Sequence, residues 1–516
     1  MFRELLPQFN VLHIQIGVPL AAGFLVTAYV AYYMFFHPLA RFPGPPLAAL
    51  SNTWKTYHIL RLDLHEAILK PHYLYGPVVR VGPNDLHFWD AKAVPAIYKA
   101  GRSMPKAGFY NAFTAFMPNL FGTTNEDQHA LRRRQLSNAF SMTSVRGLEP
   151  IMDDQLGILR QRLESMASNH EVFDLKEFLS SCMLDGLGEM AFARSFGAQK
   201  RTDPPEITAI HDHILLSCAI GQLPLQAVSK FIISWSPIPR IRNLIKSRTM
   251  LIKRCKECVQ YRILNEQPHK DLLGGIINAK DPETGASLSR LEVNTEAFAI
   301  LVAGSHSTSG TLSMLFYNIL KNPQVVKAIV QEIDDNLPRL SPTRVAHSFD
   351  GLERLPYISA CIRENFRKDP VFNMTLWRKV INPSGLFIDG NFIPRGTNVC
   401  VINYVLHHNP DIWGLDHDRY DPNRWLKDTS PSQSRHLLPF STGHRACIGR
   451  NIATVELYKV LTTLLGEYEF SLCHPEKDQR LVSLGIGELG GKLLCTVRIL
   501  DHPVSKNSDF QTNPSS

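Results

Sequence analysis

Phe440-Ser-Thr-Gly443-His-Arg445-Ala-Cys447-Ile-Gly449 is the most informative stretch in this sequence of 516 residues. Phenylalanine, two glycines, arginine and cysteine at these offsets are expected by chance in roughly one chain in ten thousand of this length, because each type makes up only a few per cent of residues. A helical pattern of apolar residues starts directly after the stretch. We therefore interpret the stretch as a loop that places one cysteine at the start of a helix.

The loop offers Cys447 the environment that a thiolate requires. Backbone N–H groups and the positive end of the helix dipole stabilise a negative sulfur at a helix N-terminus. Gly443 and Gly449 carry no side chain, which permits a close approach of the backbone that larger residues would block. An isolated cysteine is usually only a small buried hydrophobic residue, but the surroundings of Cys447 are those in which a thiolate is stabilised.

The stretch resembles the haem-binding loop of the cytochrome P-450 family, whose cysteine supplies a thiolate to iron. The resemblance implies haem b, iron protoporphyrin IX, as the cofactor and Cys447 as its axial metal ligand. It also implies that Arg445 reaches a haem propionate, that Phe440 shields the sulfur and that Gly449 completes the loop. A thiolate ligand pushes electron density onto iron and favours cleavage of the O–O bond. The resemblance covers residues 40–500, with the strongest motifs in the expected order.

A second motif of the family matches Glu364, Arg367 and Arg424. Glu364 and Arg367 stand three positions apart on one face of a predicted helix, an arrangement that is common on helices. In the family, such a pair joins a second arginine from a segment ahead of the cysteine, and Arg424 in Tyr420-Asp-Pro-Asn-Arg-Trp425 occupies the matching place. The resemblance implies a buried structural triad that locks the cysteine loop and takes no part in the chemical step.

Three further positions resemble the family's contacts to the haem propionates. His129 and Arg133 match a pair of an aromatic residue and an arginine four positions apart, with His129 in place of the more usual tryptophan. Arg378 stands where the family has another propionate-binding arginine. Two other interpretations of the run Arg132–Arg134 stay open, namely a solvated basic face and part of a docking surface for an acidic redox partner.

A nearly uncharged helical pattern from Glu292 to Leu320 has Ala303-Gly304-Ser305-His306-Ser307-Thr308 at its centre. This segment resembles the family's oxygen-activation motif, in which a small residue and a glycine open a groove beside iron, and an acid and a threonine organise protons. His306 stands in the place of the acid and Ser307 in the place of the threonine, while Thr308 offers a second hydroxyl. A hydroxyl can hold a water molecule, and an imidazole relays protons near neutral pH. Gly304, His306, Ser307 and Thr308 are therefore the predicted catalytic positions, with a helix-packing histidine at 306 as the alternative.

Aromatic residues gather between positions 109 and 121, where five of thirteen residues are aromatic, against 9% in the whole chain. The corresponding region of the family covers the haem pocket, so the resemblance implies an apolar substrate. Some of these rings are expected to belong to the core. The predicted pocket residues from this and two later stretches are Phe109, Phe113, Phe116, Phe372, Met374 and Ile486.

The segment from Val11 to Phe36 has twenty-six residues and no formal charge. A helix of this length reaches ~39 Å, more than the ~30 Å hydrocarbon layer of a bilayer. The segment ends in bulky aromatic residues, which suit a membrane interface and not a signal-peptide cleavage site. Arg41 and Lys55 follow it, and this weak positive bias favours the cytosolic side for the rest of the chain. We expect a single-pass anchor in the endoplasmic reticulum membrane, with the catalytic domain in the cytosol.

The chain divides into four predicted parts. Residues 1–36 are the N-terminal segment and transmembrane anchor, and residues 37–50 are a proline-rich hinge, because Phe42-Pro-Gly-Pro-Pro46 cannot continue a helix. Residues 51–500 form one catalytic domain without a linker-like break, and residues 501–516 are a disordered tail. Long helical patterns alternate with short strands near residues 77–89, 386–389 and 399–403. The predicted fold class is mainly α with small β-sheets (α+β), similar to the helical P-450 fold and preceded by one transmembrane helix.

Composition excludes several other classes of protein. Hydrophobic residues make up 44% of the chain and charged residues 20%, so a disordered or collagenous chain is excluded. The net charge of +8 is modest and favours an anionic membrane or an acidic protein partner over nucleic acid. The nine cysteines are scattered and odd in number, which excludes a disulfide scaffold. Apolar residues 231–235 beside basic neighbours fit either a second membrane-dipping element or ordinary helix packing.

Together these patterns predict a membrane-anchored haem-thiolate monooxygenase that hydroxylates or epoxidises a small apolar organic substrate with O2. No dinucleotide or flavin fingerprint is visible in the sequence, so electrons are expected from NADPH through a separate flavoprotein reductase. Secondary-metabolite biosynthesis is the expected context. Two alternatives stay open: a haem-thiolate enzyme for rearrangement, dehydration or oxidative coupling, which the unusual His306-Ser307 pair motivates, and a non-enzymatic membrane binder of haem or lipid.

Overall fold

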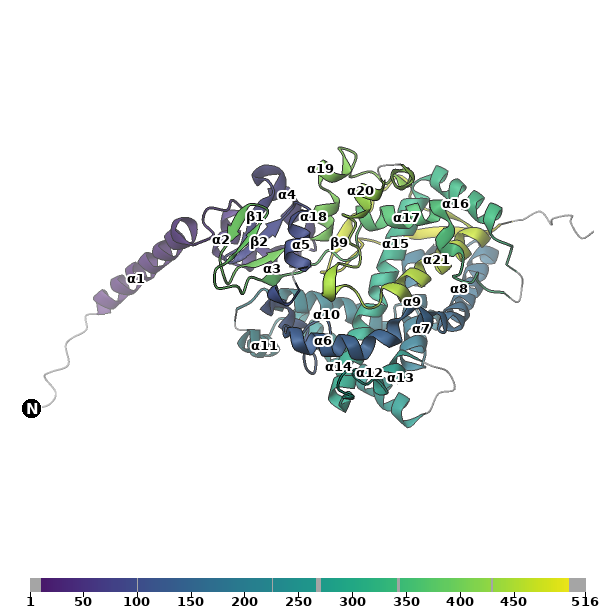
Figure 1. The fold of residues 1–516 in the computed structure, drawn as a ribbon, viewed down its shortest axis with the longest axis horizontal. Coiled ribbons are helices and arrows are strands. Elements are labelled where there is room, and N and C mark those ends of the chain that lie inside the picture. The colour runs from purple at the N-terminus through teal and green to yellow at the C-terminus, as the bar shows by residue number, and fades with distance from the viewer. Residues whose placement is uncertain are drawn as a thin grey trace, which may run out of the picture.

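The computed structural model describes residues 11–99, 101–224, 226–265, 271–340, 344–427 and 430–500. Helix α1 (Val11–Ala31) projects from the globular part and continues into a π-helical turn, η1 (Tyr32–Phe36) (Figure 1). The segment Val18–Phe36 has a mean hydropathy of 1.6, and none of it is buried. Its length and composition are sufficient to cross a membrane. The predicted disordered tail, residues 501–516, lies outside the described residues.

Helices make up most of the globular part, and several begin at start signals in the sequence. Proline stands in the first turn of α10, α12, α16 and α17, and a capping box formed by Ser289 and Glu292 starts α14. The α-helices of the globular part are α2 (Pro46–Leu50), α3 (Thr53–Leu60), α4 (Leu64–Tyr75), α5 (Ala93–Tyr98), α6 (Glu126–Ser137), α7 (Met142–Arg146), α8 (Glu149–Asn169), α9 (Leu175–Phe192), α10 (Pro205–Gly221), α11 (Gln226–Ser234), α12 (Pro239–Leu264), α13 (Leu272–Ile277), α14 (Arg290–Gly304), α15 (His306–Leu320), α16 (Pro323–Asn336), α17 (Pro356–Lys368), α18 (Asn403–His407), α19 (Pro410–Trp413), α20 (Ser430–Ser434) and α21 (Arg450–Glu467). The short 3-10 helices are η2 (Gly101–Ser103), η3 (Gly108–Phe113), η4 (Asn138–Phe140), η5 (Ala198–Lys200), η6 (Leu352–Arg354), η7 (Pro422–Leu426) and η8 (Gly443–Arg445).

The strands form small sheets at the margins of the helical body. One sheet has the order β1-β2-β7-β4, another the order β3-β11-β8, and β5-β6 and β9-β10 are two-stranded. In the first sheet, β1 and β2 form the predicted hairpin, in which Val78 lies opposite Phe88. The predicted class, mainly α with small β-sheets, is therefore confirmed. The strands are β1 (Val78–Gly82), β2 (Asp85–Phe88), β3 (Phe173–Asp174), β4 (Arg378–Lys379), β5 (Leu386–Ile388), β6 (Asn391–Ile393), β7 (Asn398–Cys400), β8 (Tyr468–Leu472), β9 (Leu481–Ser483), β10 (Gly487–Leu489) and β11 (Leu494–Ile499).

The structure differs from the prediction of one continuous helix from Glu292 to Leu320. Helices α14 and α15 meet at Ser305, so the helix is interrupted inside the predicted oxygen-activation segment. A Cβ atom at Gly304 would lie 2.6 Å from a methyl carbon of Leu187 on α9, so a larger residue at this position would displace that side chain. The Ser307 hydroxyl donates to the carbonyl of Ala303 over 2.8 Å and satisfies an acceptor near the end of α14.

The centre of the globule contains fully buried charged side chains as well as large apolar ones. Helix α15 packs against α16, α17 and α21 in this region (Figure 1). Arg367, Arg378 and Lys459 are among the largest side chains that are fully buried. Burying a charge costs several kcal/mol unless the charge is paired, on the order of what a whole core substitution costs. The residues that pair with these buried charges therefore mark the regions whose geometry the fold maintains.

Candidate functional site

The loop around Cys447 lies between η8 and the first turn of α21. The backbone N–H of Cys447 donates to the carbonyl of Phe440 over 2.9 Å and closes the loop. Gly443 has a φ of +75°, and a Cβ atom there would lie 2.2 Å from the carbonyl oxygen of Tyr98, so only glycine fits. A Cβ atom at Gly449 would meet Cys447 Sγ at 4.0 Å, an ordinary contact, so packing within the protein does not require this second glycine.

Cys447 is the one cysteine of nine that is exposed; the other eight are buried or partly buried. Desolvation raises the pKa of its thiol, while backbone N–H groups of Gly449 and Arg450 and the positive charges of Arg133 and Arg450 act in the opposite direction. Protein atoms therefore surround the sulfur closely, but its surface is open to a ligand. N–H donors at a helix N-terminus stabilise a thiolate, so this loop can hold a metal ion through Cys447.

The basic residues predicted to contact propionates lie close together, and Lys106 joins them. Burial, and then the charges of Arg378 and Arg445, hold the pKa of Lys106 well below its usual range. Burial also lowers the pKa of His129 to about 2, and Arg445, Lys106 and Arg133 add to this effect. His129 is therefore neutral and lies among basic side chains. No sequence motif indicated Lys106, which pairs with Arg378 as an isolated β-bridge.

Glu126, in the first turn of α6, is the acid that faces this cluster. It accepts hydrogen bonds from Arg445 at 2.7 and 3.1 Å and lies 2.8 Å from Nε2 of His444. Nη1 of Arg445 is buried and has no hydrogen-bond partner among the described residues. Positive charge thus exceeds negative charge, and one guanidinium nitrogen is left for a further acceptor. Three guanidinium groups, those of Arg133, Arg378 and Arg445, beside an open thiol fit haem, which carries two propionates and an iron that takes a thiolate ligand.

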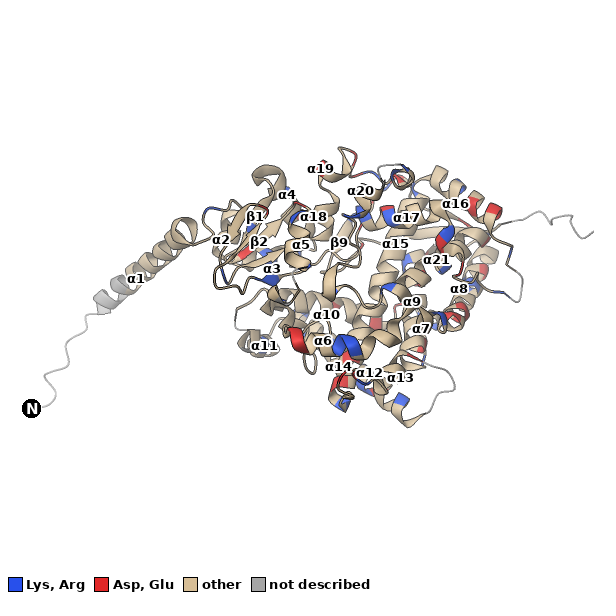
Figure 2. Ribbon diagram, in the orientation of Figure 1, with Lys and Arg blue, Asp and Glu red and all other residues tan. Residues whose placement is uncertain are grey.

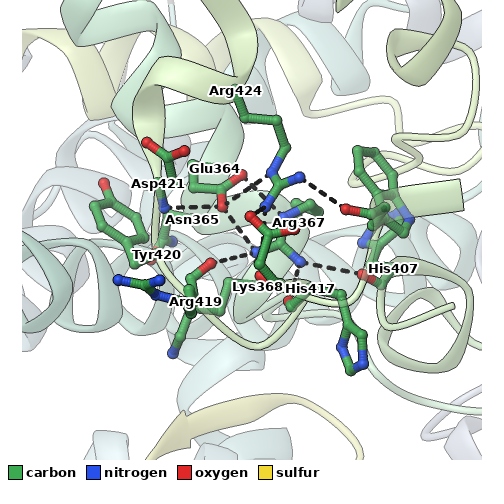
Figure 3. A network of polar contacts seen from close by, with 12 residues as sticks. Glu364, Asn365, Arg367, Lys368, His407, His417, Arg419, Tyr420, Asp421 and Arg424 are labelled. Atoms are coloured by element: carbon green, nitrogen blue, oxygen red, sulfur yellow. Dashed lines mark hydrogen bonds and ion pairs between the residues drawn. The ribbon is translucent and has the colours of Figure 1, made fainter. Parts of the chain in front are cut away.

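Glu364, Arg367 and Arg424 lie together, as the motif implied, in a network of polar contacts (Figure 3). Glu364 accepts from Arg367 at 2.8 and 2.9 Å, and Nε of Arg424 lies 3.6 Å away. Two donors that the motif does not contain also form hydrogen bonds with the Glu364 carboxylate: the indole N–H of Trp425 at 2.9 Å and the backbone N–H of Asp421 at 3.1 Å. Glu364 and Arg367 are both 0% exposed.

The network extends from α17 to the segment that leads into the cysteine loop. Burial lowers the pKa of His407 to about 3, so this ring is neutral, with one donor and one acceptor nitrogen. Its Nδ1 donates to the carbonyl of Phe366 at 3.1 Å, and its Nε2 accepts from the backbone N–H of Leu438 at 3.2 Å. Arg367 also donates to the backbone carbonyls of His407, His417 and Arg419 (Figure 3).

The predicted catalytic residues of the broken helix point in different directions. Ser307 is partly exposed beside exposed Ala303, whereas His306 and Thr308 are buried. The Thr308 hydroxyl bonds the carboxyl group of Glu456 on α21. His306 turns toward α10. The hydroxyl of Ser307 is therefore the one of the predicted set that faces the open side of the helix.

Glu456, which the sequence did not single out, has its pKa raised to about 8 by burial. An unfolded glutamate has a pKa near 4.5, so between these two values the folded protein binds one more proton than the unfolded chain. The contribution of Glu456 to stability therefore falls as pH rises from about 5 to 8. Glu456→Gln should remove this slope and stabilise the protein above pH 7, as measured by thermal unfolding at several pH values. Exposed Asp154→Asn is the control, and an unchanged slope in Glu456→Gln would contradict the prediction.

The predicted pocket residues come from three stretches, and the fold brings members of all three into contact. Rings of η3 and the following loop pack edge to face: Phe109 with Phe113 at 5.6 Å and Phe113 with Phe121 at 5.5 Å. Phe121 then meets Phe372 at 6.4 Å, and Phe372 forms an isolated bridge with Ile486. Phe116, also predicted, lies apart from this row and packs on Phe298 of α14 at 6.1 Å.

Phe109 and Met374 line the same small cavity. The side-chain amides of Gln222 and Asn373 line it too, and both are buried. Their amide nitrogens have no hydrogen-bond partner within the described part of the chain. The cavity therefore combines apolar walls with two hydrogen-bond donors that no sequence motif indicated.

Arg132 and Arg134 are already paired with acids of the same chain. In Figure 2, basic and acidic segments lie side by side where α6 and α14 meet. Arg132 is buried and contacts Glu292 at 2.5 Å and Glu296 at 3.3 Å. Arg134 contacts Asp281 at 2.8 Å. The interpretation of this run as a solvated basic face is wrong, because the packing of α6 against α14 and the segment before it supplies these partners.

Comparisons with known proteins complete the description. The Cytochrome P450 family profile matches residues 43–493, which include the cysteine loop, the triad and the basic cluster. Cytochrome P450 monooxygenase cicH of Emericella nidulans is 29% identical over 89% of this chain and 93% of that protein. Cytochrome P450 monooxygenase ORF9 of Penicillium roqueforti is 30% identical over 87% of each chain. Cytochrome P450 monooxygenase mpaDE' of Penicillium brevicompactum is 29% identical over 88% of this chain, which spans 54% of that longer relative. This chain belongs to the cytochrome P450 family, whose members bind haem through a cysteine thiolate.

Proposed function

We propose that this protein is a membrane-anchored monooxygenase that hydroxylates or epoxidises a small apolar organic substrate. One atom of O2 enters the substrate and the other leaves as water, with two electrons from NADPH delivered by a separate flavoprotein reductase and two protons from solvent. The observation that carries the proposal is the exposed Cys447 thiol at the N-terminus of α21, beside a buried cationic cluster. Fungal secondary-metabolite biosynthesis is the proposed context, because the relatives are fungal monooxygenases.

Haem b is the proposed cofactor, with Cys447 as its axial ligand. Arg133, Arg378 and Arg445 would hold the propionates, and the unpartnered Nη1 of Arg445 supports this role. Phe440 packs against Phe366 at 5.4 Å, where it would restrict access of water to the sulfur. When bound, a haem with a thiolate ligand supplies the chemistry of O2 activation. The chain's own residues position the group, exclude water and deliver protons.

The proposal is tested by the carbon monoxide difference spectrum of the reduced protein and by reconstitution with an NADPH-dependent reductase. A thiolate-ligated haem gives a strongly red-shifted Soret band, and the reconstituted enzyme should convert an apolar substrate at the expense of NADPH. A well-folded, haem-loaded protein without the red-shifted band would overturn the assignment. A red-shifted band without turnover of any substrate would favour the non-enzymatic binder.

Ser307→Ala should uncouple oxygen use, because Ser307 is the hydroxyl on the open side of the helix. We expect the product formed per NADPH to fall at least about tenfold, with the electrons recovered as hydrogen peroxide. Thr308→Val is the matched control, since Thr308 bonds Glu456 in another direction. Unaffected coupling in Ser307→Ala would favour the alternative of rearrangement, dehydration or oxidative coupling.

An apolar substrate is supported by the row of aromatic rings from η3 to Phe372. The donors of Gln222 and Asn373 in the adjoining cavity favour a substrate that also carries an oxygen acceptor. Identities of 28–30% to the relatives do not transfer a substrate from any of them.

The endoplasmic reticulum membrane is the proposed location, with α1 as the anchor and the globule in the cytosol. A second apolar surface supports this arrangement: Phe231, Ile232 and Trp235, at and after the end of α11, are all exposed. In Figure 1, α11 lies toward the end of the globule from which α1 projects. The reductase would dock near Arg450, which is exposed beside the cysteine loop.

A further inference from the structure

His306, which occupies the position of an acid in the family motif, forms a hydrogen bond with a second histidine. Nδ1 of His306 on α15 lies 2.8 Å from Nε2 of His211 on α10, and the ring centroids are 4.1 Å apart. His306 is 5% exposed, whereas the side chain of His211 is 22% exposed. The two rings therefore connect a partly solvated position to the broken helix.

A carboxylate lies beside the outer ring. Oε2 of Glu488 on β10 is 3.8 Å from Nε2 of His211 and 3.1 Å from the ammonium group of Lys176 on α9. Lys176 also donates to the carbonyl of Leu489 over 2.8 Å, which fixes the ammonium in place. A carboxylate in this position stabilises an imidazolium, as in other buried pairs of an acid and a histidine. The cluster is thus arranged to accept a positive charge on His211 for a short time.

Both rings are neutral at rest. Burial lowers the pKa of His211; Glu488 and Asp212 act in the opposite direction, and Lys176 adds to the lowering. Burial, then His211 and Lys176, hold the pKa of His306 well below its usual range. In the 2.8 Å contact one ring therefore donates an N–H and the other accepts it. Two neutral imidazoles in such a pair can pass a proton from one ring to the other, and neither ring remains protonated afterwards.

The inner end of this pair is free. Nε2 of His306 is buried and has no hydrogen-bond partner among the residues that the structure describes. A buried polar nitrogen without a partner destabilises the folded protein, so its retention calls for a reason. The next residue, Ser307, carries the hydroxyl on the open side of the helix.

We propose that His211 and His306 form a two-imidazole proton relay from solvent toward the interruption between α14 and α15, with Glu488 stabilising the charge in transit. The inference rests on the proposed monooxygenase function, which consumes two protons for each O2. A proton from solvent binds Nδ1 of His211, the proton on Nε2 of that ring passes to Nδ1 of His306, and His306 releases the proton on its Nε2 to a water molecule. Rotation or reverse exchange then restores the starting tautomers, and each N–H bond that breaks is replaced by a bond from the same proton to the next acceptor. His211 acts through His306 and is a positioning residue.

The first test replaces His211 by glutamine, which keeps a hydrogen bond to His306 but carries no proton through. In the reconstituted holoenzyme we expect turnover to fall at least about tenfold and the solvent deuterium isotope effect on turnover to rise. Haem content, the red-shifted carbon monoxide band and substrate binding should match the unmodified enzyme. The matched control is His213→Gln, because His213 is a buried histidine on the same helix that packs on Phe298.

A second readout does not depend on turnover. In the resting holoenzyme labelled with 15N at histidine, the pair should give one far-downfield proton resonance coupled to two ring nitrogens. His211→Gln should remove this resonance, and His213→Gln should not. Absence of the resonance from the unmodified enzyme would contradict the hydrogen-bonded pair itself.

The two charged neighbours predict effects of opposite sign. Glu488→Gln lowers the proton affinity of His211 and should slow turnover further as pH rises, whereas Lys176→Met raises this affinity and should not slow it. Equal turnover and an unchanged isotope effect in His211→Gln and Glu488→Gln would overturn the relay. That result is distinct from failure of the proposed function, in which the unmodified enzyme lacks the thiolate band or does not turn over.

Discussion

Replacing Cys447 by serine is expected to abolish both substrate oxidation and the red-shifted Soret band of the reduced carbon monoxide complex. The sulfur of Cys447 is accessible to a ligand, since Cys447 is exposed while every other cysteine is at least partly buried. N–H groups of Gly449 and Arg450 and the charges of Arg133 and Arg450 stabilise its anionic form. A serine hydroxyl has a far higher pKa than a thiol and would stay protonated there, so it could not replace the thiolate.

The fold should survive this substitution. The loop is closed by the backbone, through the bond from Cys447 N–H to Phe440 O and the left-handed turn at Gly443, and serine preserves both. Exchange of one sulfur for one oxygen at an exposed position typically changes stability by no more than about 1 kcal/mol. Circular dichroism and thermal unfolding of the haem-free proteins should therefore be similar, while haem content and the spectrum are not.

Cys473→Ser is the matched control for Cys447→Ser. Cys473 is only partly buried and lies at the end of β8, away from the basic cluster. This variant should keep haem content, the thiolate band and turnover. Retention of the red-shifted band in Cys447→Ser would show that another group binds the iron and would refute the assignment of the ligand.

The sequence was most informative where the chemistry is local. The cysteine loop spans ten residues and its closure needs only Gly443, the Phe440 carbonyl and the start of a helix, all of which can be predicted from adjacent positions. Glu364 and Arg367 are likewise three residues apart on one helix. Arg424 could be added because the family motif supplied the long-range partner.

Partners from distant segments were missed because no local pattern encodes them. Glu126 contacts Arg445 from 319 positions away, and Lys106 reaches the same cluster through a bridge to Arg378. His211 meets His306 only because α10 crosses α15. The break at Ser305 was also missed: the apolar pattern of α14 continues into α15, and the close packing of Gly304 on Leu187 is a tertiary contact.

Glu364→Gln is expected to have the largest effect on stability of any single substitution outside the loop. The carboxylate is 0% exposed and receives two bonds from Arg367, one from Trp425 and one from the backbone of Asp421. Removing one partner of a buried ion pair costs about 3–5 kcal/mol, because the remaining charge stays buried without compensation. The amide of glutamine also turns an N–H2 group toward donors that previously met an acceptor.

The consequence should reach the haem site through the chain of contacts around α17. Arg367 holds the carbonyls of His407 and Arg419, and the His407 ring accepts the backbone N–H of Leu438, two residues before Phe440. Loss of the carboxylate frees Arg367 and loosens these anchors. We therefore expect Glu364→Gln to lower the thermal unfolding midpoint and the fraction of protein that retains haem together.

Two comparisons between variants distinguish the loss of this network from a general effect of removing a charged group. Exposed Glu353→Gln, on η6 before α17, should leave both the midpoint and haem content unchanged. Arg367→Lys should destabilise more than Arg424→Lys, because Arg367 makes two bonds to Glu364 below 3 Å whereas Arg424 lies 3.6 Å from it and is 8% exposed. A lysine cannot reproduce the fork of donors that Arg367 extends to the carboxylate and three carbonyls. If Glu364→Gln unfolds at the same midpoint as Glu353→Gln, the carboxylate is not what holds the cysteine loop, and His407 alone must provide the connection.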